Sequence, residues 1–172
     1  MIFITGSGSI LANALCGYFR EKAEVLALPG LPAEIPAEAS CIINCHQYDD
    51  IDRAEYFRED AYRVNAEAAG QLATICCRMG IPLVQAGTSL VFGGHNERPW
   101  REDDEPQPVN VFGDSKLLAE QNILDSGCRY IIVRLPELYN ERISPFHAAI
   151  RSSREGRNWV VLKERWMAPL PA

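Results

Sequence analysis

The first twenty-two residues place the strongest constraint on the fold. Residues 1–5 (MIFIT) form a short, nearly continuous apolar run, which is typical of a strand buried on both faces of a parallel sheet. A turn with two glycines, Gly6 to Ser9, follows this run. From Ile10 to Lys22 the apolar residues recur at helical spacing. Strand, glycine turn and helix in this order open a βαβ unit.

The same alternation continues along the chain. Further strands are predicted at residues 24–28, 41–44, 82–86, 129–135 and 159–162, and further helices at residues 61–79, 111–124 and 144–155. The stretch 29–40 is an irregular connection with three prolines, and the acidic stretch 93–108 is a long loop. We therefore expect an α/β fold with a doubly wound, mostly parallel, Rossmann-like sheet. Residues 1–172 are expected to form a single domain, with ligands beyond the carboxyl ends of the strands.

The charge balance and the cysteines exclude several classes of protein. Lys and Arg number 17 against 23 Asp and Glu, a net charge of −6, which argues against binding of nucleic acid through its phosphates. The apolar runs are too short to cross a bilayer, so no membrane association is expected. The six cysteines lie mostly in apolar runs without zinc-ligand spacing, so we predict no metal site and a reducing, cytoplasmic location. The three histidines are scattered and form no evident catalytic triad with a nucleophile and an acid.

The stretch from Gly87 to Lys116 carries most of the recognisable chemistry. Thr88 stands just beyond the predicted strand 82–86, and Phe112 and Lys116 are four residues apart on the next predicted helix. This spacing puts the two side chains on one helix face. The pattern is therefore expected to bring a hydroxyl, an aromatic ring and an ammonium group together at the end of the sheet. For Lys116 alone, a solvent-facing position on the helix is the simple alternative.

Several ordered motifs support a family resemblance. From residue 1 to about residue 166, the chain resembles the extended short-chain dehydrogenases/reductases, and most of all the branch of dTDP-4-dehydrorhamnose reductases, which act on nucleotide sugars. The matching pieces are Asn44 to Tyr48 (NCHQY), Asp52 to Glu55, Val64-Asn65, Gly87-Thr88, Val91-Phe92, Arg101 to Asp103, Pro108, Asn110, Gly113, Ser115, Lys116, Glu120 and Arg134.

The resemblance implies that the chain binds a dinucleotide, NADP or NAD. In the family the first turn reads Thr-Gly-x-x-Gly-x-x-Gly, but here Ser9 and Ala12 replace the later glycines. Ser9 either crowds the pyrophosphate or donates a hydrogen bond to it, and a relic turn that holds no dinucleotide is the alternative. Leu28-Pro29 stands where the family often has a charged residue, so NAD and NADP are not distinguished. The implied cofactor-binding residues are Thr5, Gly6, Gly8, Ser9, Ile10, Leu11, Asn44, Cys45, His46, Asn65 and Lys116.

The resemblance also implies catalytic roles. In the family a Tyr-x-x-x-Lys pair protonates the substrate oxygen as the hydride arrives, while a hydroxyl polarises the carbonyl. Here Thr88 and Lys116 are present, but Phe112 replaces the tyrosine. The implied reaction is reduction of the 4-keto group of a nucleotide-linked deoxysugar, impaired because Phe112 has no proton to give. The alternative is a non-catalytic regulatory or scaffolding protein with the same fold.

The family continues into a C-terminal substrate-binding portion that this chain largely lacks. Residues 154–162 resemble its beginning. Either the chain is naturally short, and a second copy or a partner subunit covers the exposed apolar surface, or it is a fragment of a longer protein.

Overall fold

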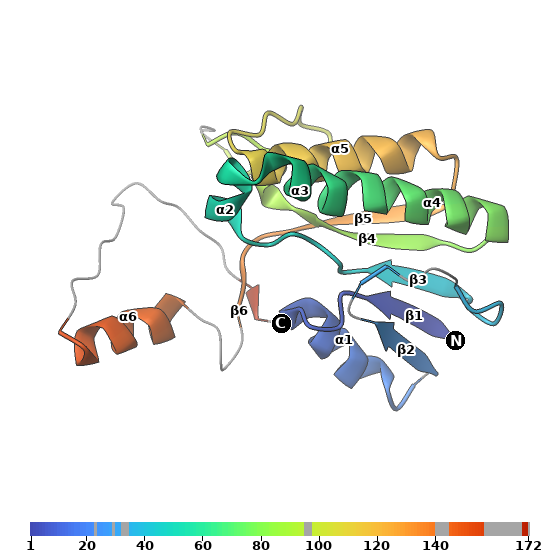
Figure 1. Cartoon of the computed structure of the whole chain (residues 1–172), viewed down its shortest axis with the longest axis horizontal. Helices are drawn as coiled ribbons and strands as arrows, with labels where there is room; N and C mark the ends of the chain where they lie inside the picture. The colour runs from blue at the N-terminus through green and yellow to red at the C-terminus, as the bar shows by residue number, and fades with distance from the viewer. Residues whose placement is uncertain are drawn as a thin grey trace. The chain divides into compact units, whose positions relative to one another are not determined.

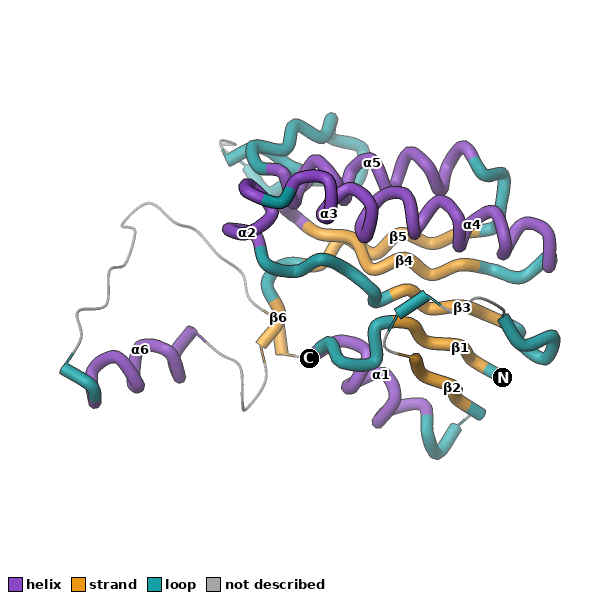
Figure 2. Tube along the Cα trace, in the orientation of Figure 1, coloured by secondary structure: helices purple, strands orange, loops and turns teal. Residues whose placement is uncertain are grey.

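The computed structural model describes residues 1–22, 24–28, 30–31, 35–94, 98–139, 145–156 and 170–171. The chain forms two compact units, residues 1–135 and residues 136–172. The first contains a five-stranded parallel sheet flanked by helices (Figures 1 and 2). Its strands are β1 (Ile2–Thr5), β2 (Val25–Leu28), β3 (Cys41–Asn44), β4 (Leu83–Thr88) and β5 (Tyr130–Leu135).

The strand order confirms the predicted doubly wound, parallel sheet. The strands lie in the order β2-β1-β3-β4-β5, and all neighbours are parallel. Thr5 is in register with Leu28 on one side and with Asn44 on the other. Because the strand order reverses between β1 and β3, their carboxyl ends form the topological switch point at which such sheets bind ligands.

Helices cover the two faces of the sheet. The helices of the first unit are α1 (Ile10–Phe19), α2 (Ile51–Tyr56), α3 (Arg58–Tyr62), the π-helix η1 (Arg63–Glu67), α4 (Ala68–Met79), the short 3₁₀-helix η2 (Ser89–Val91) and α5 (Val111–Asp125). Phe3 belongs to a core cluster with residues of α4 and α5, whereas Ile4 belongs to a cluster with residues of α1. Since adjacent strand residues point to opposite faces, α1 lies on one face and α4 and α5 lie on the other.

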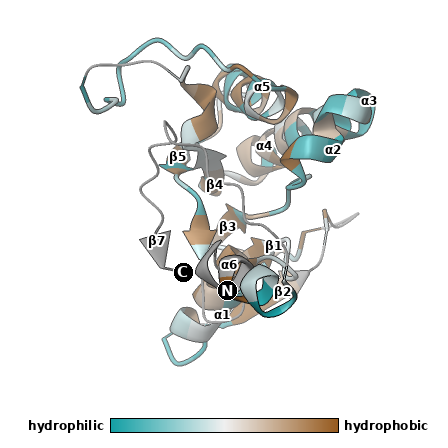
Figure 3. Ribbon diagram, turned by 90° about the vertical axis from the view of Figure 1, so that its left-hand side faces the viewer, coloured by the Kyte–Doolittle hydropathy of each residue, from teal (hydrophilic) through white to brown (hydrophobic). Residues whose placement is uncertain are grey.

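The helical segment between β3 and β4 begins earlier than the sequence predicts. It was expected at residues 61–79, but helix starts at Ile51, where the Asp50 carboxylate accepts a hydrogen bond from the backbone N–H of Arg53 at 2.9 Å. A break at Phe57 separates α2 from α3. Both helices are mostly polar, as their teal ribbon in Figure 3 shows. Only single small residues such as Ala54 and Ala61 are buried, so the apolar period that marks a helix is weak here.

The second unit contains β6 (Leu138–Tyr139), α6 (Pro145–Arg154) and β7 (Leu170–Pro171), with β6 and β7 paired in parallel. The helix predicted at residues 144–155 is therefore present over its described part. The strand predicted at residues 159–162 lies outside the described residues.

Two further observations concern membrane-spanning helices and cysteines. Within the described ranges, no helix is long and apolar enough to cross a membrane. All six cysteines are free thiols, and three of them, Cys45, Cys76 and Cys128, are buried.

The turn after β1 yields a first prediction, because it admits only glycine. Gly6 has φ = 71°, and a Cβ there would lie 2.6 Å from the backbone atoms of Cys45 and His46. We expect Gly6→Ala to destabilise the protein by about 2–4 kcal/mol, through backbone strain and displacement of the facing loop. Gly8→Ala is the matched control, because none of the residues that the structure describes lies within 4 Å of a Cβ at Gly8. Urea unfolding measures both; equal midpoints for the two variants would contradict the prediction.

Candidate functional site

A chain of buried polar side chains joins the carboxyl ends of β1, β3 and β4. The Thr5 hydroxyl donates a hydrogen bond to Asn44 Oδ1, which also accepts from the backbone N–H of His46 at 3.2 Å. Asn44 Nδ2 donates to Gln85 Oε1 at 2.7 Å, and Gln85 Nε2 donates to the carbonyl oxygen of Ala86 at 3.0 Å. Because every link is satisfied inside the protein, the network holds the three strand ends in a fixed arrangement.

The glycine turn sits against this network. Because Gly6 has no side chain, its backbone can lie directly against the Cys45–His46 peptide. Ser9 is the N-cap of α1, and its side-chain oxygen accepts a hydrogen bond from the backbone N–H of Ala12 at 3.2 Å. Ser9 therefore stabilises the start of the helix, and a phosphate contact from its hydroxyl proton remains a prediction.

Lys116 is buried beneath the strand ends, so the simple alternative of a solvent-facing lysine is wrong. It is 2% exposed. Its Nζ donates to the carbonyl oxygen of Ala86 at 2.7 Å and to Gln47 Oε1 at 3.2 Å. Burial lowers the pKa of Lys116 to about 8, although electrostatic interactions with Cys45 and Glu120 oppose the shift. The protein therefore holds a buried, hydrogen-bonded ammonium group at pH 7.

Cys45 and Gln47 surround this ammonium group. Burial raises the pKa of the Cys45 thiol to about 12 in spite of the nearby Lys116 charge, so Cys45 stays protonated and is a poor nucleophile. The sequence did not predict that Gln47 accepts a hydrogen bond from Lys116, although Gln47 lies inside the NCHQY motif. The one feature that could have pointed to Gln47 is its polar side chain in a motif that follows a buried strand.

The low pKa of Lys116 yields a second prediction. We expect the folded protein to lose this proton near pH 8, whereas an unfolded chain keeps it up to about pH 10.4. Between these pH values the unfolded state binds more protons than the folded state. The free energy of unfolding should therefore rise with pH in this window because of Lys116. Below pH 8 Lys116 is protonated in both states and should not make the free energy of unfolding depend on pH. Nζ and Cε chemical shifts in lysine-labelled protein report the titration. Lys116→Met removes both the signal and the rise, and a midpoint above pH 10 would contradict the prediction.

Thr88 ends β4 and is nearly buried. Its Oγ1 accepts a hydrogen bond from the backbone N–H of Leu90 at 3.2 Å and so caps η2. A hydroxyl that accepts in this way still has its own proton to donate. Thr88 lies two residues beyond Ala86, whose carbonyl holds Lys116. The end of β4 therefore fixes both the Thr88 hydroxyl, a neutral hydrogen-bond donor, and the ammonium group of Lys116.

Phe112 is part of a packed apolar cluster at the start of α5. It is 5% exposed and is buried with Ala54, Ala61 and Val111, while Tyr48, Tyr62 and Leu90 pack against this cluster. The ring thus fills space in the core and offers no proton. The start of α5 lies so close to η2 that a Cβ on Gly113 would overlap the carbonyl oxygen of Leu90.

Asn65 lies among internal contacts on the helix side of the site. Its Oδ1 accepts from the backbone N–H of Tyr48 at 2.7 Å, and its Nδ2 donates to Ser115 Oγ at 2.9 Å. Ser115 in turn donates to the carbonyl oxygen of Phe112 at 2.8 Å. Asn65 therefore ties the loop after β3 to α5 and positions the helix that carries Lys116.

An ion pair anchors the segment that follows β4. Arg134 Nη2 lies 2.7 Å from Glu120 Oε2, and the Glu120 side chain is 6% exposed. The Arg134 guanidinium lies 4.9 Å from the centre of the Phe92 ring, which stacks on Trp100 at 4.8 Å. Trp100 is thus held by packing against Phe92, with part of its ring still exposed.

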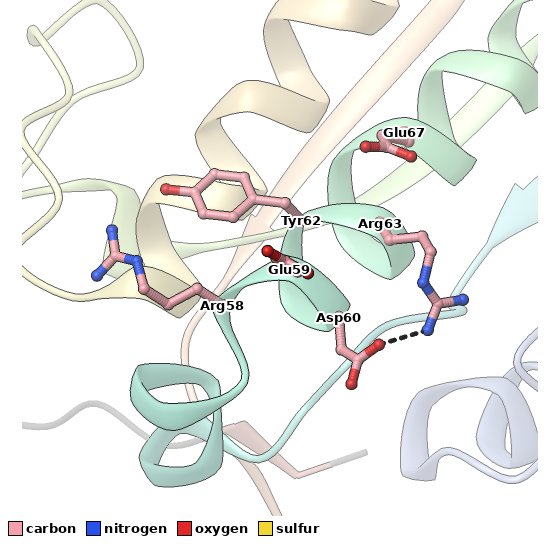
Figure 4. A pocket seen from close by; sticks show the side chains of 6 residues that line it. All are labelled: Arg58, Glu59, Asp60, Tyr62, Arg63 and Glu67. Atoms are coloured by element: carbon pink, nitrogen blue, oxygen red, sulfur yellow. Dashed lines mark hydrogen bonds and ion pairs between the residues drawn. The ribbon is translucent and has the colours of Figure 1, made fainter.

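A separate surface pocket lies on α3 and η1 (Figure 4). Within it, Arg63 forms an exposed ion pair with Asp60 at 2.6 Å, and the Tyr62 hydroxyl donates to Asp114 on α5. It shares no lining residue with the strand-end site, and its lining is mostly solvated charge: Arg58, Glu59, Asp60, Tyr62, Arg63 and Glu67.

The predicted site residues therefore fall into two groups. Direct interactions connect the residues of the first group at the strand ends: Thr5, Gly6, Asn44, Cys45, His46 and Lys116. Next to them lie the turn and helix start that hold Gly8, Ser9, Ile10 and Leu11. Phe112 and Asn65 belong to the packing around α5. Over the described part of the chain, no three His, Cys, Asp or Glu side chains are grouped so that they could hold a metal ion.

Comparison with known proteins places this arrangement in a family. The family model described as the RmlD substrate binding domain matches residues 1–169. The chain belongs to the RmlD family. The dTDP-4-dehydrorhamnose reductase of Mycolicibacterium smegmatis is 34% identical over 149 residues, which cover 80% of this chain and 46% of that protein.

Two other similar proteins are informative. A dTDP-4-dehydrorhamnose reductase from Bacillus anthracis, solved in complex with NADP, superposes with a TM-score of 0.79 at 27% identity and covers 91% of this chain and 60% of its own. Methionine adenosyltransferase 2 subunit beta from Bos taurus is 33% identical over 100 residues, 58% of this chain and 30% of that protein. The chain spans about half the length of the reductases from mycobacteria that it matches.

Proposed function

We propose that this chain is the dinucleotide-binding part of a reductase that transfers a hydride from NADPH or NADH to the 4-keto group of a nucleotide-linked deoxysugar. The observation that carries the proposal is the joint anchoring of Thr88 and Lys116 at the end of β4. The names of the relatives, dTDP-4-dehydrorhamnose reductases, and the NADP complex of one of them support the substrate class and the cofactor.

The residues at the switch point fit a dinucleotide. The Gly6 turn leaves no room for a side chain and leads into the N-terminus of α1, where backbone N–H groups favour a pyrophosphate. In this proposal Lys116 holds the ribose hydroxyls with its ammonium group. A dinucleotide bound here supplies the hydride, and Thr88 donates its proton in a hydrogen bond to the substrate's carbonyl oxygen.

The protonation step is the weak point of this site. Phe112 carries no exchangeable proton, and the hydroxyl of Thr88 is a far weaker acid than a phenol. Lys116 is protonated at pH 7, since its pKa is about 8, and water is the other available donor. We therefore expect slow turnover, limited by delivery of a proton to the substrate oxygen.

Transfer of deuterium tests the proposal without requiring fast turnover. The protein, in excess, is incubated with dTDP-4-dehydrorhamnose and NADPH deuterated at the transferable position, and the product is examined by mass spectrometry. One deuterium on the sugar carbon that carried the ketone is the expected result. Thr88→Val is the matched control, because it keeps the shape of the side chain and removes the donor. Undeuterated sugar with both wild type and Phe112→Tyr contradicts the proposal.

A second function is favoured by the environment of Phe112. A phenyl ring packed into an apolar cluster is stable without any catalytic role, and one relative is named as a subunit of another enzyme. In this alternative the fold is a regulatory or scaffolding platform that binds a second copy or a partner subunit. Native mass spectrometry distinguishes the two: the alternative predicts a stoichiometric complex and no gain in reduction for Phe112→Tyr.

A further inference from the structure

The imidazole of His46 reaches an unexpected place on the sheet. His46 follows β3, and Gly30 follows β2, with β1 lying between these two strands. His46 Cε1 nevertheless lies 3.9 Å from the position that a Cβ would take on Gly30. The ring therefore extends across the carboxyl end of β1 to the end of β2.

The backbone of His46 is held firmly in this position. Its N–H donates to Asn44 Oδ1 at 3.2 Å, and the Cys45–His46 peptide rests directly on the Gly6 turn. Because both contacts belong to the buried network at the strand ends, the imidazole projects from a rigid base rather than from a free loop.

The end of β2 is where a dinucleotide-binding sheet reads the adenosine ribose. An acidic residue there accepts a hydrogen bond from the 2′-hydroxyl of NAD, while a cationic residue nearby accommodates the 2′-phosphate of NADP. In this chain, residues 25–31 (VLALPGL) contain no charged side chain. The stretch thus supplies neither an acceptor for the 2′-hydroxyl nor a carboxylate that repels the 2′-phosphate. The edge of the His46 imidazole that carries Cε1, the carbon between its two ring nitrogens, faces the same place.

We propose that His46 sets the cofactor preference of this protein by donating a hydrogen bond to the 2′-phosphate of NADPH. The inference rests on the proposed function, because it requires a dinucleotide at the strand-end site. A hydrogen bond to a charged phosphate is stronger than one to a neutral hydroxyl, so NADPH is bound more tightly than NADH.

Calorimetric titration of the full chain with NADPH and NADH tests the assignment. We expect His46→Ala to weaken NADPH binding by about tenfold, as for loss of one hydrogen bond to a charged group. Binding of NADH should stay within about twofold, because its 2′-hydroxyl gains little from the imidazole. Titration with 2′,5′-ADP and with 5′-AMP isolates the adenosine half, and only 2′,5′-ADP should respond to the variant.

Gly30→Asp is the reciprocal variant. Gly30 is not among the glycines with a left-handed φ, and within the described part of the chain its added Cβ meets His46 alone, at an ordinary contact distance, so the described surroundings should tolerate the change. A carboxylate there repels the 2′-phosphate and accepts from the 2′-hydroxyl, so the preference should reverse towards NADH. Gly30→Ala adds the Cβ without the charge and should leave the preference unchanged.

The outcomes separate the inference from the proposed function. If both dinucleotides bind and His46→Ala leaves their ratio unchanged, or weakens both equally, the role of His46 is wrong and the cofactor site stands. If the folded wild-type protein binds neither dinucleotide, the proposed function fails and the inference fails with it.

Discussion

Replacing Phe112 by tyrosine is expected to increase the single-turnover rate of ketone reduction by about 10²–10⁴, the usual value of a positioned general acid. Phe112 and Lys116 are one helical turn apart on α5, and Lys116 is held near Thr88 by the carbonyl of Ala86. Tyrosine keeps the shape of the ring, and the nearby ammonium charge favours ionisation of its phenol. The rate is measured with NADPH and dTDP-4-dehydrorhamnose under protein excess.

Two controls define the origin of this gain. Phe112→Leu replaces the ring with an aliphatic side chain and adds no proton donor, so the single-turnover rate should not increase. Phe112→Tyr combined with Lys116→Met should lose most of the gain, because the phenol pKa is no longer lowered by the ammonium group. A Phe112→Tyr protein that folds, binds NADPH and reacts no faster than wild type would show that the missing hydroxyl is not what limits the reaction.

The second large effect concerns the buried ion pair. Arg134→Ala is expected to lower the free energy of unfolding by about 3–5 kcal/mol, because it leaves the carboxylate of Glu120 buried without its partner. The Glu120 side chain is only 6% exposed, and the pair includes a contact of 2.7 Å. The variant also removes the guanidinium that lies over Phe92. Urea unfolding at pH 7 measures the change.

An exposed ion pair on the same chain provides a matched control. Arg63 and Asp60 are 65% and 49% exposed, so Arg63→Ala should change the free energy of unfolding by no more than about 0.5 kcal/mol. Replacing Glu120 and Arg134 together by leucine should recover most of the loss, since no unpaired charge remains. Similar costs for Arg63→Ala and Arg134→Ala would contradict the assignment of the pair as a buried one.

The fold was largely predictable because its signals are local. The apolar runs of the five strands and the glycine turn after residue 5 were sufficient to predict a doubly wound parallel sheet. The start of α2 was missed because its buried face consists of isolated alanines such as Ala54, which give little hydrophobic periodicity. Helix there depends on packing against α5 and on the Asp50 cap rather than on a strong local pattern.

The site was only partly predictable, because its geometry depends on contacts between distant segments. The sequence placed Thr88 and Lys116 together. It marked Gln47 only as a polar residue of a motif that follows a buried strand, and did not indicate that Gln47 accepts a hydrogen bond from the lysine 69 residues away. The reach of the His46 ring to Gly30 also depends on the strand order, which brings β1 between them. Hydrogen-bond partners of this kind follow from tertiary packing and leave no periodic trace in the sequence.

Titration of the folded protein with NADPH by calorimetry shows directly whether the strand ends around Gly6 and Lys116 form a working dinucleotide site. We expect saturable binding with a micromolar dissociation constant for wild type, and a strong loss of affinity for Lys116→Met, which lacks the ammonium group. If folded wild-type protein does not bind NADPH, the strand ends are not a dinucleotide site and the fold is a platform for other proteins.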